Sequence, residues 1–116
     1  MNIKRIEQTK IMHRIVQAND TLYFGGLVAD NHDQSMAGQT QEICAKIDAL
    51  LAAAGSDKSK LLSAQIFITD MSAKDEMNNV WTKWLPAEVF PARATIGVAS
   101  LGGANVLIEV VVTAAV

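Results

Sequence analysis

Six stretches of the chain have the residue pattern of β-strands, either an alternation of hydrophobic and polar residues or, in the last stretch, a short aliphatic run. They span residues 3–10, 13–18, 21–28, 62–69, 92–98 and 106–112. The alternation is weak in residues 3–10, which favours a position at the edge of a sheet. Asn19-Asp20 is a turn signal, so the second and third stretches are expected to form a hairpin.

Two further stretches have hydrophobic residues at helical spacing. The first runs from Met36 to Ala54, where Ser35 or Asp33 can cap its start and Gly55 ends it. The second begins at Ser72, which forms a variant of the capping box with Asp75. Pro86 ends this second helix, and its two tryptophans fit the buried stripe better than a ligand cage.

The predicted order of elements is therefore βββαβαββ, without a repeat or a second domain. It indicates one α+β domain over residues 1–116, with two helices on one face of a mixed six-stranded sheet. The last strand is apolar on both faces apart from Glu109. Two helices cover only one face of a sheet, so the other face is expected to be buried against another chain.

Composition and charge exclude several classes of protein. Half of the residues are hydrophobic and 19% are charged, which excludes disorder. A net charge of −2 without a basic patch argues against nucleic-acid binding, and no apolar run reaches membrane-spanning length. The single cysteine, Cys44, allows no internal disulfide and indicates a cytoplasmic protein. Two histidines and one cysteine, widely spaced, make no metal-ligand pattern, and no cofactor is expected.

Two charged residues in apolar strands are the candidates for chemistry. Arg93 follows Phe90-Pro91-Ala92 at the start of one strand, and Glu109 lies in the middle of the next. If these strands form a hairpin, the two side chains share a face and can approach each other. Two interpretations remain open: a structural ion pair, or an anion-binding arginine beside a carboxylate that orients water. Gly25-Gly26, within the third strand, indicates either a bulge or the close approach of a backbone or ligand.

The same residues resemble a known family. Phe90-Pro91-Ala92-Arg93, followed by an apolar strand and Leu107-Ile108-Glu109, is similar to the C-terminal signature of the RidA/YjgF family of reactive intermediate deaminases. Residues 23–29, 39–55 and 62–70 are similar to the family's glycine-ended strand, first helix and following strand. The resemblance implies the chorismate-mutase-like fold and a homotrimer with clefts between subunits. It also implies that Arg93 binds the carboxylate of an imine or enamine and that Glu109 places the hydrolytic water, with no metal or cofactor.

Three positions depart from the family pattern. Gly25 stands where deaminase members usually have a serine, and Thr95 where they often have a cysteine; the Thr95 hydroxyl can still donate a hydrogen bond. The family's N-terminal tyrosine has no counterpart, and His13 or Arg14 either contributes to ligand binding there or is an ordinary surface residue.

These departures leave the function open between two main alternatives. The first is a hydrolase resembling a 2-iminobutanoate/2-iminopropanoate deaminase. In it Glu109 and Thr95 serve catalysis, while Arg93, Gly25, Gly26 and Arg14 bind substrate. The second is a non-catalytic binder or sensor of small 2-oxo or amino acids. A ribonuclease activity, also ascribed to the family, fits the acidic chain least.

Overall fold

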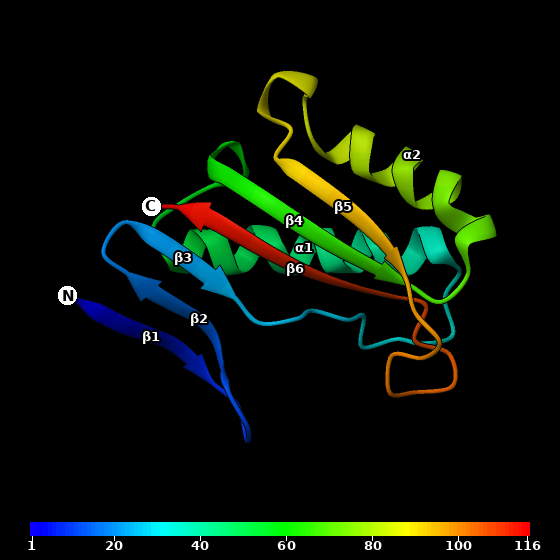
Figure 1. The fold of residues 1–116 in the computed structure, drawn as a ribbon, viewed down its shortest axis with the longest axis horizontal. Coiled ribbons are helices and arrows are strands. Elements are labelled where there is room, and N and C mark those ends of the chain that lie inside the picture. The colour runs from blue at the N-terminus through cyan, green and yellow to red at the C-terminus, as the bar shows by residue number, and fades with distance from the viewer.

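The computed structural model describes residues 1–116 as one six-stranded mixed sheet with both α-helices on the same face (Figure 1). The strands are β1 (Ile3–Gln8), β2 (His13–Ala18), β3 (Thr21–Phe24), β4 (Leu61–Ile68), β5 (Ala92–Gly97) and β6 (Ile108–Ala115). The helices are α1 (Met36–Ala53) and α2 (Lys74–Trp84), and short 3₁₀ turns occupy Lys58–Lys60, Met71–Ala73 and Ala87–Val89. The predicted order βββαβαββ and the predicted fold class are confirmed.

The strands lie in the spatial order β1-β2-β3-β6-β4-β5. All neighbours are antiparallel except β4 and β5, which are parallel because α2 carries the chain back between them. The expected hairpin of the last two strands is therefore wrong. β4 lies between β5 and β6, and residues 98–107 form a long loop where a hairpin would have a short turn.

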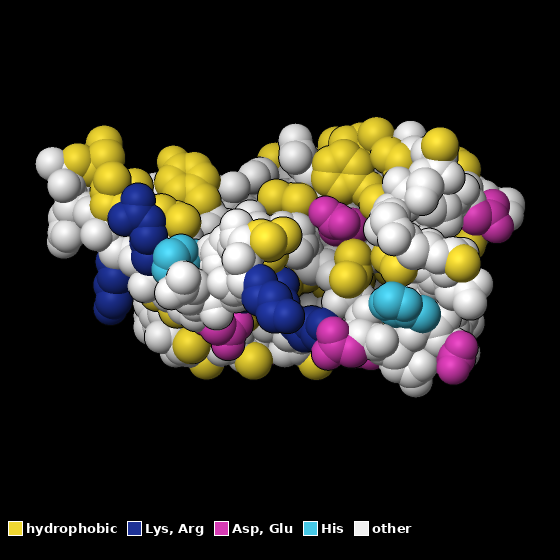
Figure 2. Space-filling view, turned by 90° about the horizontal axis from the view of Figure 1, so that it is seen from below, with side chains coloured by type: hydrophobic (Ala, Val, Ile, Leu, Met, Phe, Trp, Pro, Cys, Tyr) yellow, Lys and Arg dark blue, Asp and Glu magenta, His cyan; other side chains and the backbone are white.

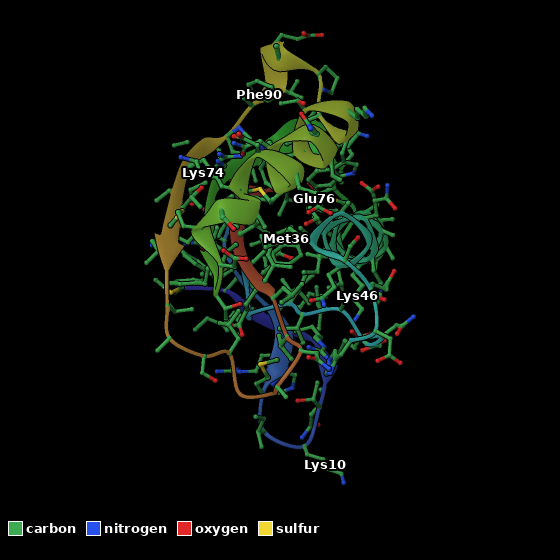
Figure 3. All side chains as sticks on the ribbon, turned by 90° about the vertical axis from the view of Figure 1, so that its right-hand side faces the viewer. Lys10, Met36, Lys46, Lys74, Glu76 and Phe90 are labelled. Atoms are coloured by element: carbon green, nitrogen blue, oxygen red, sulfur yellow. The ribbon has the colours of Figure 1, made fainter.

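Helix α1 begins and ends as its sequence indicates. The Ser35 side chain accepts a hydrogen bond from the Gly38 amide, and Gly55 adopts φ = 77° after the last turn. The start of α2 differs from the prediction. Asp70 caps the preceding 3₁₀ turn by accepting from the Ser72 amide, and α2 itself begins after Ala73 without a side-chain cap. Glu76 of α2 accepts a hydrogen bond from the Ala37 amide (3.1 Å), which joins α2 to the start of α1 (Figure 3).

The core lies between the sheet and the two helices. It contains alternate residues of β4 and β6 together with the apolar stripes of the helices, and its fully buried members include Ile43, Ile47, Leu51, Ile66, Ile68, Met77 and Ile108. No helix of the chain is both long enough and apolar enough to cross a membrane.

The opposite face of the sheet has no helix over it. Phe67 and Val111 are only half-buried there, and Tyr23 is 52% exposed. Figure 2 shows hydrophobic side chains gathered along its upper margin, which is the sheet face turned toward the viewer in Figure 1. A single chain therefore leaves apolar surface of the sheet in contact with water.

The loop of residues 98–107 is fixed to α1 by Gln39, a polar side chain that is fully buried. Its amide nitrogen donates to the backbone oxygen of Asn105 (2.8 Å), and its amide oxygen accepts from the backbone nitrogen of Leu107 (3.0 Å). One side chain thus pairs with the backbone on both sides of Val106, as a neighbouring strand would. This contact holds Leu107 directly before the start of β6 at Ile108, and Glu109 is the second residue of that strand.

Candidate functional site

Arg93 occupies the second position of β5, the strand at one edge of the sheet. Pro91 disfavours helical backbone at Phe90, so the short helical turn of residues 87–89 gives way to a strand at this point. Arg93 lies opposite Ala64 of β4, which is buried beneath the helices, so the Arg93 side chain is on the helix side of the sheet.

The guanidinium of Arg93 rests against α2. It lies 5.7 Å from the centre of the Trp81 ring, and Nη2 donates to Oδ1 of Asn78 at 2.7 Å. Partial burial lowers the pKa of Arg93 from its ordinary value, yet an arginine remains charged at neutral pH. The single hydrogen bond to Asn78 leaves further N–H donors available to a ligand.

These residues line a cavity of about 330 Å³. Its walls are Asn78, Trp81, Thr82, Phe90, Pro91 and Arg93. Phe90 is 46% exposed beside this cavity. Figure 3 labels this residue near the top of the molecule. The arrangement places one cation beside apolar walls, which suits a small carboxylate with an apolar part.

Glu109 lies on the other side of the sheet. It is opposite Phe67 of β4, whereas its neighbours Ile108 and Val110 face the helices and are buried. Arg93 and Glu109 of one chain therefore point to opposite faces, and the expected shared face is wrong. The structural ion pair is wrong as well, because none of the three salt bridges in the chain includes either residue.

The double glycine lies beside Glu109. β3 ends at Phe24, earlier than predicted, although the Gly25 amide still donates to the Arg14 oxygen (2.9 Å) and Leu27 pairs with Val110. A Cβ atom at Gly26 would overlap the Glu109 carboxylate, so the absence of a side chain at Gly26 makes room for that group. The group that comes close to Gly26 is thus a side chain of the same sheet, and not the backbone or ligand that the sequence led us to expect.

The remaining candidates lie apart from this pair. Thr95 is half-buried on β5, opposite Ile66 and on the same side as Arg93. Arg14 is on β2, near the opposite edge of the sheet from β5, and lines a different cavity. The structure therefore brings Arg93 and Thr95 to one side of the sheet and Glu109 and Gly26 to the other.

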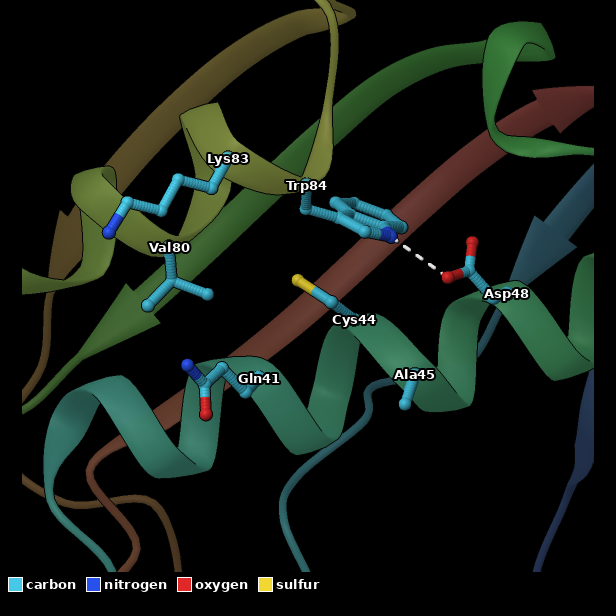
Figure 4. Close-up of a pocket in the computed structure, with 7 residues that line it drawn as sticks. All are labelled: Gln41, Cys44, Ala45, Asp48, Val80, Lys83 and Trp84. Atoms are coloured by element: carbon cyan, nitrogen blue, oxygen red, sulfur yellow. Dashed lines mark hydrogen bonds between the residues drawn. The ribbon is translucent and has the colours of Figure 1, made fainter.

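A third cavity, of about 310 Å³, lies between α1 and α2 (Figure 4). It contains the thiol of Cys44, and the Trp84 indole donates to Asp48 at 3.0 Å across one side. Burial, aided by the charge of Asp48, raises the pKa of the Cys44 thiol to about 12. At neutral pH the thiol is therefore protonated and inert, in agreement with its interpretation as a core residue.

Asn78 is a functional candidate that the sequence did not indicate. Nothing in its neighbourhood distinguishes it from the other polar residues on α2, and its role depends on the distant Arg93 packing against that helix. The nearest sequence signal is Trp81, one turn along α2, a buried residue that also lines this cavity.

The fold and this site define a class: an α+β protein with an arginine-based cavity at the edge of its sheet. The sequence model described as "Endoribonuclease L-PSP" matches residues 3–116, and the chain belongs to this RidA/YjgF family. The RutC family protein YoaB of Escherichia coli is 37% identical over 116 residues and is covered in full, as is this chain.

A solved structure and a more distant relative support the same family assignment. A YjgF-family structure from Neisseria meningitidis superposes with a TM-score of 0.94 at 36% identity, covering 99% of this chain and 95% of that one. The chloroplastic Reactive Intermediate Deaminase A of Arabidopsis thaliana is 27% identical over 105 residues, which cover 84% of this chain and 56% of that protein.

Proposed function

We propose that the protein hydrolyses reactive imines and enamines derived from amino acids, releasing ammonia and a 2-oxo acid. Rid proteins deaminate such intermediates. In this chain Arg93 follows Phe90-Pro91-Ala92, the motif that resembles the C-terminal signature of that family. The observation that carries the proposal is the Arg93 guanidinium, which borders a cavity of about 330 Å³ and retains free donors.

The active site is formed by two protomers of a homotrimer. Arg93 and Glu109 of one chain point to opposite faces of the sheet, so they can meet only when they come from different chains. Burial of the uncovered, half-apolar sheet face against a neighbour supplies the reason to associate. Arg93 and Thr95 then come from one protomer, and Glu109 with Gly25 and Gly26 comes from the next.

The chemistry follows from the charges. Arg93 holds the substrate carboxylate with a planar, bidentate pair of hydrogen bonds, and Thr95 donates a further one. Glu109 accepts a proton from water as the water oxygen bonds to the imine carbon. The resulting carbinolamine takes that proton on nitrogen. As the C–N bond breaks, Glu109 accepts the proton of the carbinolamine hydroxyl, and ammonia leaves with a C=O group in its place. A protonated imine is electrophilic enough for this addition.

The decisive experiment measures ammonia release from 2-iminopropanoate generated in situ by an amino-acid oxidase. Arg93→Ala should weaken binding of 2-oxobutanoate by about 2–5 kcal/mol, and Arg93→Lys should recover little of this loss. Glu109→Gln should bind 2-oxobutanoate normally but hydrolyse the imine about 10²–10⁴-fold more slowly. Arg5→Ala, a change at an exposed arginine of β1, is the matched control.

A non-catalytic binder is the second candidate, because Gly25 stands where deaminase members usually have a serine and Thr95 where they often have a cysteine. For a binder, wild type and Glu109→Gln would bind 2-oxobutanoate alike and neither would accelerate imine hydrolysis. Unchanged affinity in a folded Arg93→Ala protein would remove the carboxylate site from both candidates.

A further inference from the structure

A separate cavity of about 290 Å³ lies between α1 and the N-terminal strands. Its apolar floor consists of Leu27, Ala49, Leu50 and Ala53, and two of these, Leu27 and Leu50, are buried core residues. The cavity borders β1 and β2, whereas Arg93 is on β5 at the opposite edge of the sheet. The two cavities share no residue.

Charged groups of both signs line the rim of this cavity: Glu7, Arg14, Asp30 and Lys46. Lys46 is already bound, because its Nζ donates to the Val28 oxygen and to Asp30, each at 2.8 Å (Figure 3 shows Lys46 on α1 beside the loop that precedes it). The Arg14 guanidinium, in contrast, has no hydrogen-bonded partner within the chain. Its one ionic contact joins its Nε to the Glu7 carboxylate at 3.9 Å. The Arg14 guanidinium therefore has N–H donors available for the carboxylate of a ligand.

The carboxylates are the accessible part of the rim. The side chains of Glu7 and Asp30 are 59% and 86% exposed. With Arg14 and Lys46 they give the lining a net charge of zero, so a simple anion would be repelled by two carboxylates and a simple cation by two bases. A ligand with one positive and one negative group can pair with the carboxylates and with the bases at the same time.

We propose that this cavity binds a zwitterionic α-amino acid with an aliphatic side chain. The carboxylate lies on the Arg14 guanidinium, and the ammonium group lies by Glu7 and by Oδ2 of Asp30, since Lys46 binds only Oδ1 of that residue. The side chain packs on the floor of Leu27, Ala49 and Leu50. A cavity of this size accepts a small ligand of about this length. The site is independent of the proposed deaminase site and needs no turnover there.

The test is calorimetric titration of the intact protein with L-leucine as the probe. Two analogues remove one charge each: 4-methylpentanoate lacks the ammonium group, and 3-methylbutylamine lacks the carboxylate. L-Leucine should bind, and each analogue should bind at least about tenfold more weakly, because each leaves one charged partner unmatched. Equal affinity of an analogue and L-leucine would overturn the proposal, as would no binding at millimolar L-leucine.

Variants locate the binding. Arg14→Gln should weaken L-leucine binding at least about tenfold, and Ala49→Leu should do the same by filling the floor. Arg5→Gln, at an arginine of β1 outside the cavity lining, should bind as wild type. Arg93→Ala should also keep its affinity, whereas loss of L-leucine binding in Arg93→Ala alone would assign the ligand to the other cavity and refute the proposal. Thermal melts of each variant identify any that fail to fold.

Discussion

Among single residues, Cys44 has the most altered acid–base behaviour. Burial raises its pKa from 9.0 to about 12, so the folded chain favours the neutral thiol. The stability that this provides is complete below about pH 9 and is lost as the pH rises from 9 toward 12. Denaturant unfolding at pH 8 and pH 10.5 should therefore show a larger loss for wild type than for Cys44→Ala. Equal losses in the two proteins, or rapid alkylation of native Cys44 at pH 7.5, would contradict this burial.

Residue identities predicted the candidates but not their surroundings. Arg93 and Glu109 were identifiable because single charges in apolar strands are costly without a purpose. Gly26 was identifiable as a point of close approach, but its neighbour was not, since Glu109 is far away in sequence. Asn78 carried no signal, because a hydrogen bond between distant elements depends on packing that local pattern does not encode.

At the scale of elements, the contact of Gln39 with the start of β6 makes a sharp prediction. Gln39→Leu keeps the size of the side chain but removes the partner of the half-buried Leu107 amide, whereas the carbonyl of the exposed Asn105 can turn to water. One unsatisfied group costs about 1–3 kcal/mol, so the free energy of unfolding should fall by about that amount. Gln41→Leu, at an exposed position on the same helix, should change it little. Similar stability of the two variants in urea denaturation would refute the role given to Gln39.

The elements themselves were well predicted, and their neighbours less so. Periodicity located all six strands and both helices, because alternation and helical spacing are local properties. Pairing is not local. β5 and β6 are consecutive in the sequence, yet β5 pairs in parallel with β4 because α2 returns the chain to the same end of the sheet. That one misassigned neighbour led to the wrong expectation that Arg93 and Glu109 share a face.

For the whole molecule, a site shared between chains predicts complementation. Arg93→Ala and Glu109→Gln are each expected to be inactive alone, but a mixed assembly places an intact Arg93 next to an intact Glu109. After co-refolding in equal amounts, random association should restore about a quarter of wild-type ammonia release, since each interface draws its two residues independently. Arg93→Ala mixed with an Arg93→Ala/Glu109→Gln double variant should restore none. No recovery in the first mixture would assign both residues to one chain.

The proposed two-chain site, which rests on the opposed faces of Arg93 and Glu109, also makes activity depend on protein concentration. A protein with a complete site in each chain keeps the same turnover per molecule at any dilution. Here the turnover per molecule would decline once the protein is diluted below the concentration at which half of it is assembled. A ligand that contacts two chains binds only the assembled form and therefore shifts the association equilibrium toward it. Bound substrate would thus stabilise the oligomer that hydrolyses it.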